Sequence, residues 1–200
     1  GDVYKRQGFH AELSNQFNTN KDPSTSFSKE DREDSLEMLI ESYKALAADT
    51  TNLISNLSNA SSLLWHCYKG LNVNVNWTGF YILNKDSTEN VDSKPKSLIL
   101  GPFQGKVACQ EIFFGKGVCG TAASEKKTQL VTDVNQCVNH IACDGETKSE
   151  IVVPILYENE VVGVIDLDCL DLQGFDELDQ AFLEQLAKEI SSTCDWKKYL

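Results

Sequence analysis

Two aspartates, Asp166 and Asp168, alternate with apolar residues in the segment 161–169. Residues two apart on an extended strand point to the same face, so both carboxyl groups would lie on one face, about 7 Å apart. Glu150 begins another apolar segment and would approach the aspartates if the two segments pair as a hairpin. Crowded carboxyl groups raise at least one pKa and leave a proton available at neutral pH. The pattern suits a cationic ligand, a metal ion or a proton donor, and it also fits a solvated strand face.

Strict alternation along this strand assigns its side chains to two faces. The expected faces are Val162, Val164, Asp166 and Asp168 on one side, and Val161, Ile165 and Leu167 on the other.

Seven cysteines, an odd number, occur in the chain. They cannot all pair within one molecule, and no export leader is visible, so we expect free thiols in a reducing compartment. Cys119 lies in the glycine turn 117–120, which we expect to open a short helix, and a helix N-terminus lowers the pKa of a thiol. Cys109 is expected on a strand leading to this turn, and Cys143 in a long loop beside Asp144. These segments could bring three thiols together. The cysteines expected to be buried or surface spectators are Cys67, Cys169 and Cys194.

Aromatic and histidine residues leave further alternatives. Trp77 and Tyr81, four residues apart on a predicted strand, face the same way and either pack in the core or form a wall around a small apolar group.

Cys137-x2-His140-x2-Cys143 has the spacing of zinc ligands, but the second pair that structural zinc needs is missing. Calcium or magnesium would need an Asp/Asn-rich loop with a turn glycine, which is also missing. We therefore assign no metal site and expect His140 to be a loop or packing residue.

The elements that must position these residues follow from apolar spacing and turn residues. We expect helices from Ser28, over 52–69, over 120–127 and over 175–196, and strands over 76–83, 97–100, 106–114, 128–131, 151–157 and 161–169. A turn over 101–105 would join the second and third strands. Strands grouped in runs indicate an α+β fold, in which a central antiparallel sheet carries helices on one face and a ligand pocket on the other.

Composition limits the function classes. The chain has 18 basic and 30 acidic residues, a net charge of −12, which argues against nucleic-acid binding. At 41% hydrophobic residues it can bury a core, and no apolar run reaches the roughly 18 residues of a membrane span. We expect a flexible polar tail over 1–27 and a single domain over 28–200. We expect a cytoplasmic location and leave the nucleus open as a second one.

Several segments read together resemble the free methionine-(R)-sulfoxide reductases, a family of single-domain enzymes with the GAF fold. The segments that carry this resemblance are 76–81, 101–109, 115–122, 140–144, 149–154 and 163–168. The separations of 10 residues from Cys109 to Cys119 and 24 residues from Cys119 to Cys143 fit the family pattern. The resemblance runs from about Ser28 to Trp196, is greatest to fungal members, and leaves 84–96 as a local insertion.

The resemblance implies a redox cycle without a bound cofactor. Cys143 would attack the sulfoxide sulfur and become a sulfenic acid, and Cys109 and Cys119 would resolve it as a disulfide. Thioredoxin, with NADPH and thioredoxin reductase, would reduce that disulfide. Whether Cys143 or Cys119 acts first stays open. The family analogy also implies a homodimer.

The resemblance also implies how free methionine-(R)-sulfoxide is bound. Trp77 and Tyr81 would hold its S-methyl group. The acids that would bind its ammonium group and sulfoxide oxygen are Glu150, Asp166 and Asp168, with Asp144 beside them. The alternative is a non-catalytic GAF module that senses a small ligand, although such a module normally needs an output domain and no motif for one is seen.

This assignment agrees with the chemistry. The sulfoxide oxygen needs a proton as a thiolate attacks, and crowded carboxyl groups supply one. The same negative charge opposes ionisation of Cys143, so we expect the substrate's ammonium group to help activate the thiol. Acids that pair with a free ammonium should also reject methionine sulfoxide within a peptide, where the nitrogen is an uncharged amide.

Overall fold

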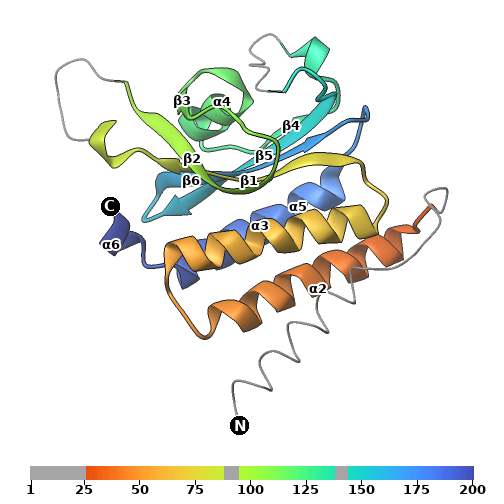
Figure 1. Ribbon diagram of the computed structural model, residues 1–200, viewed down its shortest axis with the longest axis horizontal. Helices are drawn as coiled ribbons and strands as arrows, with labels where there is room; N and C mark the ends of the chain where they lie inside the picture. The colour runs from red at the N-terminus through yellow and green to blue at the C-terminus, as the bar shows by residue number, and fades with distance from the viewer. Residues whose placement is uncertain (1–25, 88–94, 138–143) are drawn as a thin grey trace.

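The computed structural model describes residues 26–87, 95–137 and 144–200. The expectations for most of the tail, for His140 and for Cys143 lie outside the described residues. The described chain has a six-stranded antiparallel sheet of order β3-β2-β1-β6-β5-β4. Helices α3 and α5 cover one face, α2 packs on the outer side of these two helices, and α4 covers the other face (Figure 1). The predicted α+β architecture is confirmed.

The helices are α2 (Lys29–Ala47), α3 (Leu53–Gly70), α4 (Gly117–Glu125), α5 (Glu177–Thr193) and α6 (Trp196–Tyr199). The strands are β1 (Val75–Leu83), β2 (Ser97–Gly105), β3 (Glu111–Phe113), β4 (Gln129–Val131), β5 (Ser149–Tyr157) and β6 (Glu160–Cys169). Two short 3-10 turns cover Lys85–Ser87 and Val134–Gln136.

The long helices begin where side chains satisfy their free N–H groups. Ser28, where the sequence predicted the start of a helix, accepts from the backbone N–H of Asp31 at 3.0 Å and forms a capping box at α2. Asn52 caps α3 through the N–H of Ser55 at 3.0 Å, and Asp176 caps α5. Each cap contributes about 1 kcal/mol. The caps thereby satisfy N–H groups that have no partner within the helix.

The apolar core has two parts, one on each face of the sheet. The larger part fills the space between the sheet and the helices α2, α3 and α5; among its fully buried side chains are Leu64, Tyr68, Ile165, Leu183 and Trp196. The smaller part lies between the sheet and α4; its members include Trp77, Tyr81, Val118, Ala122 and Val164. The central strands are therefore buried on both sides, and polar groups on them are shielded from water.

The hairpin of β5 and β6 is confirmed, with a tighter turn than expected. Glu158 and Asn159 both have positive φ, 51° and 64°, which suits a two-residue hairpin turn. A bulge then leaves Val162 without a partner, because Leu156 pairs with Val161 and Ile155 with Gly163. The predicted faces of Val161 and Val162 are therefore wrong: Val161 packs on the α4 side and Val162 on the helix side.

The path between the second and third strands also differs from the expectation. The segment 101–105, predicted as a turn, continues β2, whereas 106–110 is a loop, and β3 is only three residues long. Cys109 is thus in a loop and not on a strand. Pro102 is compatible with β2 because β3 pairs only with residues 97–99, so β2 is an edge strand where the proline lies.

The short helix α4 begins three residues earlier than predicted, at Gly117. Its Gly120 packs against β3 so closely that a Cβ atom there would lie 2.2 Å from the carbonyl oxygen of Phe113. The helix predicted over 175–196 is divided in two, since α5 ends at Thr193 and the short helix α6 begins at Trp196. Among the described residues, no helix is both long and apolar enough to span a membrane.

Candidate active site

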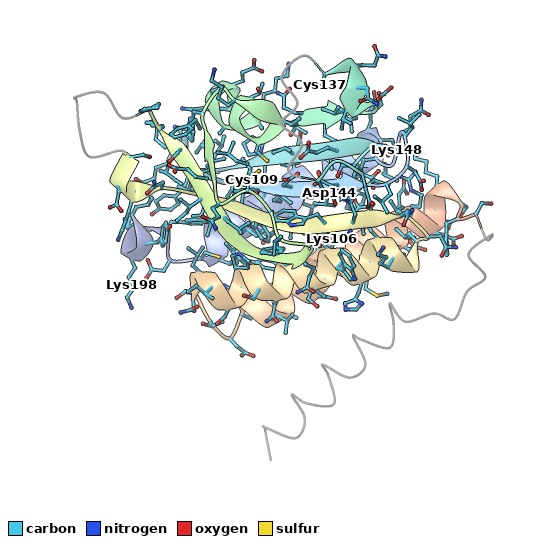
Figure 2. All side chains as sticks on the ribbon, turned by 45° about the horizontal axis from the view of Figure 1, so that its top comes forward. Lys106, Cys109, Cys137, Asp144, Lys148 and Lys198 are labelled. Carbon is cyan, nitrogen blue, oxygen red and sulfur yellow. The ribbon has the colours of Figure 1, made fainter. Side chains whose placement is uncertain are left out.

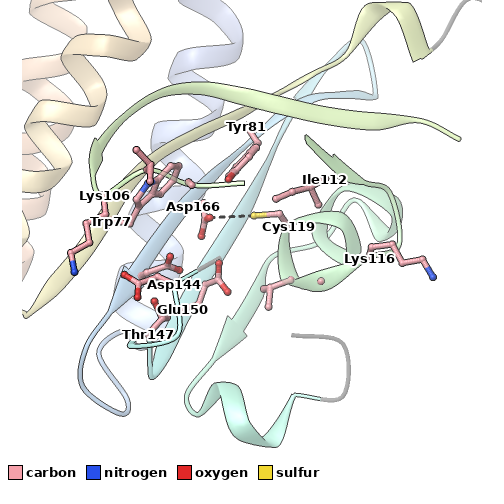
Figure 3. A pocket seen from close by; sticks show the side chains of 15 residues that line it. Trp77, Tyr81, Lys106, Ile112, Lys116, Cys119, Asp144, Thr147, Glu150 and Asp166 are labelled. Carbon is pink, nitrogen blue, oxygen red and sulfur yellow. Dashed lines mark hydrogen bonds between the residues drawn. The ribbon is translucent and has the colours of Figure 1, made fainter. Parts of the chain in front are cut away.

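A pocket lies on the sheet face opposite the three long helices, between the centre of the sheet and α4 (Figure 3). Strands β1, β5 and β6 form its floor, α4 forms one wall, and two loops border its mouth. The side chains and backbone that line it belong to Trp77, Tyr81, Lys106, Val107, Ala108, Ile112, Lys116, Gly117, Val118, Cys119, Asp144, Thr147, Glu150, Asp166 and Asp168.

The three acids predicted to converge do so. Strand pairing sets Glu150 opposite Asp168 and Val152 opposite Asp166. Glu150 and Asp166 are only 6% and 5% exposed. Burial, followed by the charge of Asp166, raises the pKa of both Glu150 and Asp168 well above the usual carboxyl range. The predicted rise of at least one pKa is confirmed, and burial and crowding favour the protonated forms of Glu150 and Asp168.

Cys119 lies directly against these acids. Its Sγ donates to Oδ2 of Asp166 at 3.3 Å, the dashed line in Figure 3. Burial, then the charge of Asp166, raises the pKa of the Cys119 thiol well above its usual value. The expectation that the helix N-terminus lowers this pKa is therefore wrong, because desolvation and nearby acids outweigh the helix dipole. In this arrangement Cys119 is a protonated thiol.

Cys109 is disulfide-bonded, whereas the other described cysteines, Cys67, Cys119, Cys137, Cys169 and Cys194, are free. The expectation of free thiols thus fails at Cys109. Its loop is held to β1 by Tyr81, whose hydroxyl donates to the carbonyl oxygen of Cys109 at 2.9 Å. Figure 2 shows Cys109, Lys106 and Asp144 on the sheet face turned away from the long helices. Cys67, Cys169 and Cys194 are buried, as expected of spectators.

Aromatic rings form the wall beside the acids. Trp77 stacks on Tyr81 with ring centroids 5.7 Å apart, and on Phe103 with centroids 5.1 Å apart. The shared face of Trp77 and Tyr81 was predicted, but Phe103 was missed because its segment was expected to be a turn. The residue that could have indicated this position of Phe103 is Gly79, which lies opposite it in β1. A Cβ atom at Gly79 would lie 2.4 Å from the Cβ of Phe103, so the strand needs glycine there.

Two polar atoms that belong to pocket-lining residues are buried without a hydrogen-bond partner among the described residues. They are Nε1 of Trp77, a donor, and Oδ1 of Asp168, an acceptor. Buried polar atoms normally have partners, so a donor and an acceptor left over at one pocket indicate that it receives a polar ligand.

Asn76, which the sequence analysis did not single out, holds the loop at the mouth. Its Nδ2 donates to Oδ2 of Asp144 and to Oγ1 of Thr147, each at 3.0 Å. The N–H of Glu146 and the Asn76 amide lower the pKa of Asp144, in that order of effect. Asp144 therefore favours its ionised form, in contrast to Glu150 and Asp168 behind it, whose pKa is raised.

The deep end of the pocket also offers metal-ligand atoms. One atom from each of Cys119, Glu150 and Asp166 lies within 4.8 Å of the others. A divalent ion would have to displace the protons that burial favours on these groups. The sequence pattern with zinc-ligand spacing consists of Cys137, His140 and Cys143. Only Cys137 is among the described residues, so the structure does not test that pattern.

The arrangement combines a proton-rich acid cluster, a thiol, an ionised carboxylate and a flat aromatic wall in one pocket. Such a pocket can bind a small molecule with a cationic group and a short apolar group. It can also deliver protons to an oxygen atom of that molecule.

Comparison with known proteins agrees with this chemistry. Residues 59–194 match the GAF domain family. A Saccharomyces cerevisiae protein called free methionine-R-sulfoxide reductase is 59% identical over 167 residues, which cover 83% of this chain and 89% of the yeast protein. An Escherichia coli protein of the same name is 39% identical over 160 residues, or 78% of this chain and 88% of that protein. The Neisseria meningitidis free methionine-R-sulfoxide reductase, solved with its substrate, superposes with a TM-score of 0.75 at 33% identity, covering 88% of this chain and 98% of that one.

Proposed function

Because the chain belongs to the free methionine-R-sulfoxide reductase family of GAF-domain proteins, we propose that this pocket reduces free L-methionine-(R)-sulfoxide to L-methionine. The predicted family, GAF fold and oxidoreductase class are confirmed. The observation that carries the proposal is the contact between the Cys119 thiol and a buried acid cluster, in which burial and crowding raise the pKa of Glu150 and Asp168. We also propose residues 28–200 as one GAF domain, which extends beyond the matched range 59–194 on both sides.

The substrate would lie with its sulfur between the aromatic wall and the acids. Trp77 and Tyr81, supported by Phe103, would contact the S-methyl group, since a flat apolar surface accepts a methyl group without desolvating a polar one. The residues proposed to bind the ammonium group and the sulfoxide oxygen are Glu150, Asp166 and Asp168, with the ionised Asp144 at the mouth.

The proposed first step is attack by the Cys143 thiolate on the sulfoxide sulfur. This attack joins the two sulfur atoms, the acid cluster protonates the sulfoxide oxygen, and the S–O bond breaks as the oxygen leaves as water. Water then attacks the cysteine sulfur, the bond between the two sulfur atoms breaks, and methionine leaves. The products are methionine and a sulfenic acid, so the sulfoxide is reduced and the thiol oxidised. A second thiol then displaces water from the sulfenic acid and forms a disulfide.

The state of Cys119 supports this order of events. A raised pKa and a hydrogen bond to Asp166 make Cys119 a poor nucleophile in this arrangement, because only a thiolate attacks efficiently. Cys143 therefore remains the proposed nucleophile, although it lies outside the described residues. The disulfide at Cys109 is the chemistry expected of a resolving cysteine. Cys119 would act later, as a resolving thiol or as a hydrogen-bond donor beside the acids.

Thioredoxin, recharged by NADPH and thioredoxin reductase, is the proposed external reductant, because a dithiol protein can reduce a protein disulfide by exchange. The proposal includes no bound cofactor. It also includes a homodimer, on the family analogy alone, and a cytoplasmic location, with the nucleus as a second one.

A coupled assay tests the proposal. Thioredoxin, thioredoxin reductase and NADPH are mixed with the full chain, and NADPH loss and methionine are followed after free methionine-(R)-sulfoxide is added. We expect methionine to appear with the free amino acid and not with the same residue inside a peptide. Changing Cys109 or Cys143 to Ser should stop multiple turnover. Binding of the sulfoxide without any methionine formed would instead support the alternative, a non-catalytic ligand sensor.

A further inference from the structure

The charges around the pocket leave one part of the proposed substrate without a binding partner. A free amino acid carries a carboxylate as well as an ammonium group. Four of the described lining residues are acids and supply no positive charge to pair with that carboxylate, namely Asp144, Glu150, Asp166 and Asp168. The cationic side chains among the described lining residues are Lys106 and Lys116, so a contact for the carboxylate is sought there.

Lys106 stands at the mouth, next to the aromatic wall. It follows Gly105, which pairs with Trp77 in the sheet. Gly105 has a φ of 129°, and a Cβ atom there would lie 2.6 Å from the carbonyl oxygen of Asn76. This close approach, open only to glycine, brings the following lysine beside β1 and the Asp144 loop.

Lys106 already holds a carboxylate at this position. Its Nζ lies 3.7 Å from Oε2 of Glu146, across the mouth of the pocket, and the two side chains are 76% and 68% exposed. An ion pair this exposed contributes little to stability, so exchange of Glu146 for another carboxylate costs little. The pair thus shows that the Lys106 ammonium reaches a carboxylate beside the Asp144 loop.

Lys116 is placed differently. It precedes α4, and in Figure 3 it extends on the far side of Cys119 and Ile112, away from Trp77 and Asp144. A carboxylate on that side would leave the substrate's ammonium group far from Asp144. Lys106 is on the same side as Asp144, so one amino acid could present its ammonium group to the acids and its carboxylate to Lys106.

We propose that Lys106 binds the α-carboxylate of the substrate, exchanging Glu146 for it, and thereby selects α-amino acids. This inference rests on the proposed function and adds a specificity-determining residue to it. Lys106 and Asp144 together would recognise both charged groups of a free amino acid. A sulfoxide that lacks either group would lose one of the two contacts.

The test compares two substrates that differ only in the carboxylate. They are methionine-(R)-sulfoxide and its decarboxylated amine, 3-(methylsulfinyl)propylamine, which keeps the ammonium group and the sulfoxide. Lys106→Met should raise KM for the amino acid about tenfold, the size of one charge-assisted contact, with kcat nearly unchanged. For the amine, wild type and Lys106→Met should have the same KM. Lys127→Met, which removes a lysine outside this pocket, is the matched charge control.

Glu146→Gln sharpens the test, because it removes the competing carboxylate. It should lower KM for the amino acid in the wild-type background and have no effect in the Lys106→Met background. A tenfold rise with Lys116→Met in place of Lys106→Met, or an equal rise for both substrates, overturns the assignment to Lys106. If the wild-type chain forms no methionine from the amino acid, the proposed function fails instead, so the two failures are distinguishable.

Discussion

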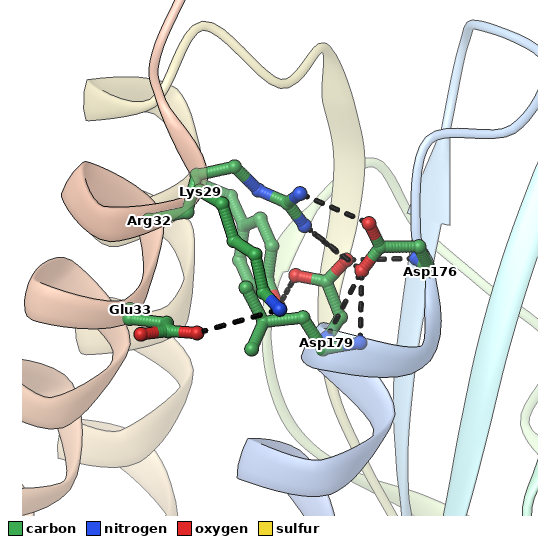
Figure 4. Close-up of polar contacts among 7 residues, drawn as sticks. Lys29, Arg32, Glu33, Asp176 and Asp179 are labelled. Atoms are coloured by element: carbon green, nitrogen blue, oxygen red, sulfur yellow. Dashed lines mark hydrogen bonds and ion pairs between the residues drawn. The ribbon is translucent and has the colours of Figure 1, made fainter.

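Two acidic clusters lie on opposite faces of the sheet, and they are stabilised in opposite ways. On the helix side, Arg32 of α2 contacts Asp176 at 2.9 Å and Asp179 at 3.0 Å, and Tyr68 of α3 donates to Asp179 at 2.9 Å (Figure 4). On the pocket side, Glu150 is surrounded by the other two acids of its cluster and by Cys119.

Hydrogen-bond donors and a cation make the difference. Arg32 lowers the pKa of Asp176. Burial raises the pKa of Asp179 only to about 6, because the N–H of Asp176, the Tyr68 hydroxyl and Arg32 oppose it, in that order of effect. In the pocket, burial and mutual repulsion raise the pKa of Glu150 and Asp168 together. The first cluster keeps charge and ties three helices together. The second keeps protons and places them beside a thiol. Paired acids here serve stability, whereas crowded acids serve chemistry.

The largest expected effect is on the pocket side. Glu150→Gln removes a proton-holding group while keeping its shape, and kcat/KM should fall about 100-fold or more, the usual contribution of a general acid. Steady-state kinetics of methionine formation measures it.

The same change should leave the free energy of unfolding at pH 7 unchanged or higher, because it relieves crowding among buried acids. Denaturant unfolding followed by circular dichroism provides this control. A large loss of stability with full activity in the folded fraction would reverse the comparison.

The second effect is expected on the helix side. Arg32→Met leaves Asp179 buried without its cation, and the free energy of unfolding should fall by about 2 kcal/mol. The loss is smaller than for a fully buried pair because Asp176 is 54% exposed. Urea denaturation at pH 7 measures it, and Lys29→Met, which removes only an exposed pair with Glu33, is the control. The kcat/KM per folded molecule should not change, and a tenfold loss would contradict a purely structural role.

The two clusters also differ in how far the sequence could predict them. The pocket acids belong to one hairpin, so alternation and antiparallel pairing predicted their convergence. Arg32 and Asp179 are 147 residues apart, and nothing local connects them. The raised pKa of Cys119 could not be predicted from the sequence either. It depends on burial against β6, whereas the glycine turn indicated only that Cys119 lies at the start of a helix.

Errors of register had a similar cause. The residues 101–105 contain glycine and proline and looked like a turn, but pairing with β1 extends them as a strand. Phe103 therefore joined the aromatic wall without having been predicted. The bulge at Val162 likewise depends on pairing between two strands, which the pattern within one strand does not show.

The third prediction concerns pH. Burial raises the pKa of Asp179 from 3.8 to about 6 in the folded chain. Between these values the folded state binds a proton that the unfolded state has released, so this contribution is full below about pH 4 and is lost as the pH rises through about 6. Wild type should therefore lose about 2 kcal/mol more stability than Asp179→Asn between about pH 4 and pH 7.

Denaturant unfolding at several pH values measures this difference. Asp176, whose pKa is lowered, stabilises the fold above about pH 4 and loses that effect only in stronger acid, so it does not act in this window. The pocket acids are present in both proteins and cancel in the difference. Parallel pH profiles for the two proteins would show that the hydrogen bonds from Asp176 and Tyr68, together with Arg32, fully offset the burial of Asp179.

The smallest expected effects come from the aromatic residue beside each cluster. The Tyr68 hydroxyl donates to Asp179, so Tyr68→Phe should lower the free energy of unfolding by about 1 kcal/mol without changing KM.

Trp77 is the counterpart in the pocket: it pairs with Asp168 in the sheet, and its Nε1 has no partner among the described residues. Trp77→Phe should therefore raise KM for the sulfoxide about threefold while the unfolding free energy changes by less than about 1 kcal/mol. If both substitutions instead lowered the free energy of unfolding equally and left KM unchanged, the two aromatic residues would have the same structural role. That result would contradict the assignment of Trp77 to ligand binding.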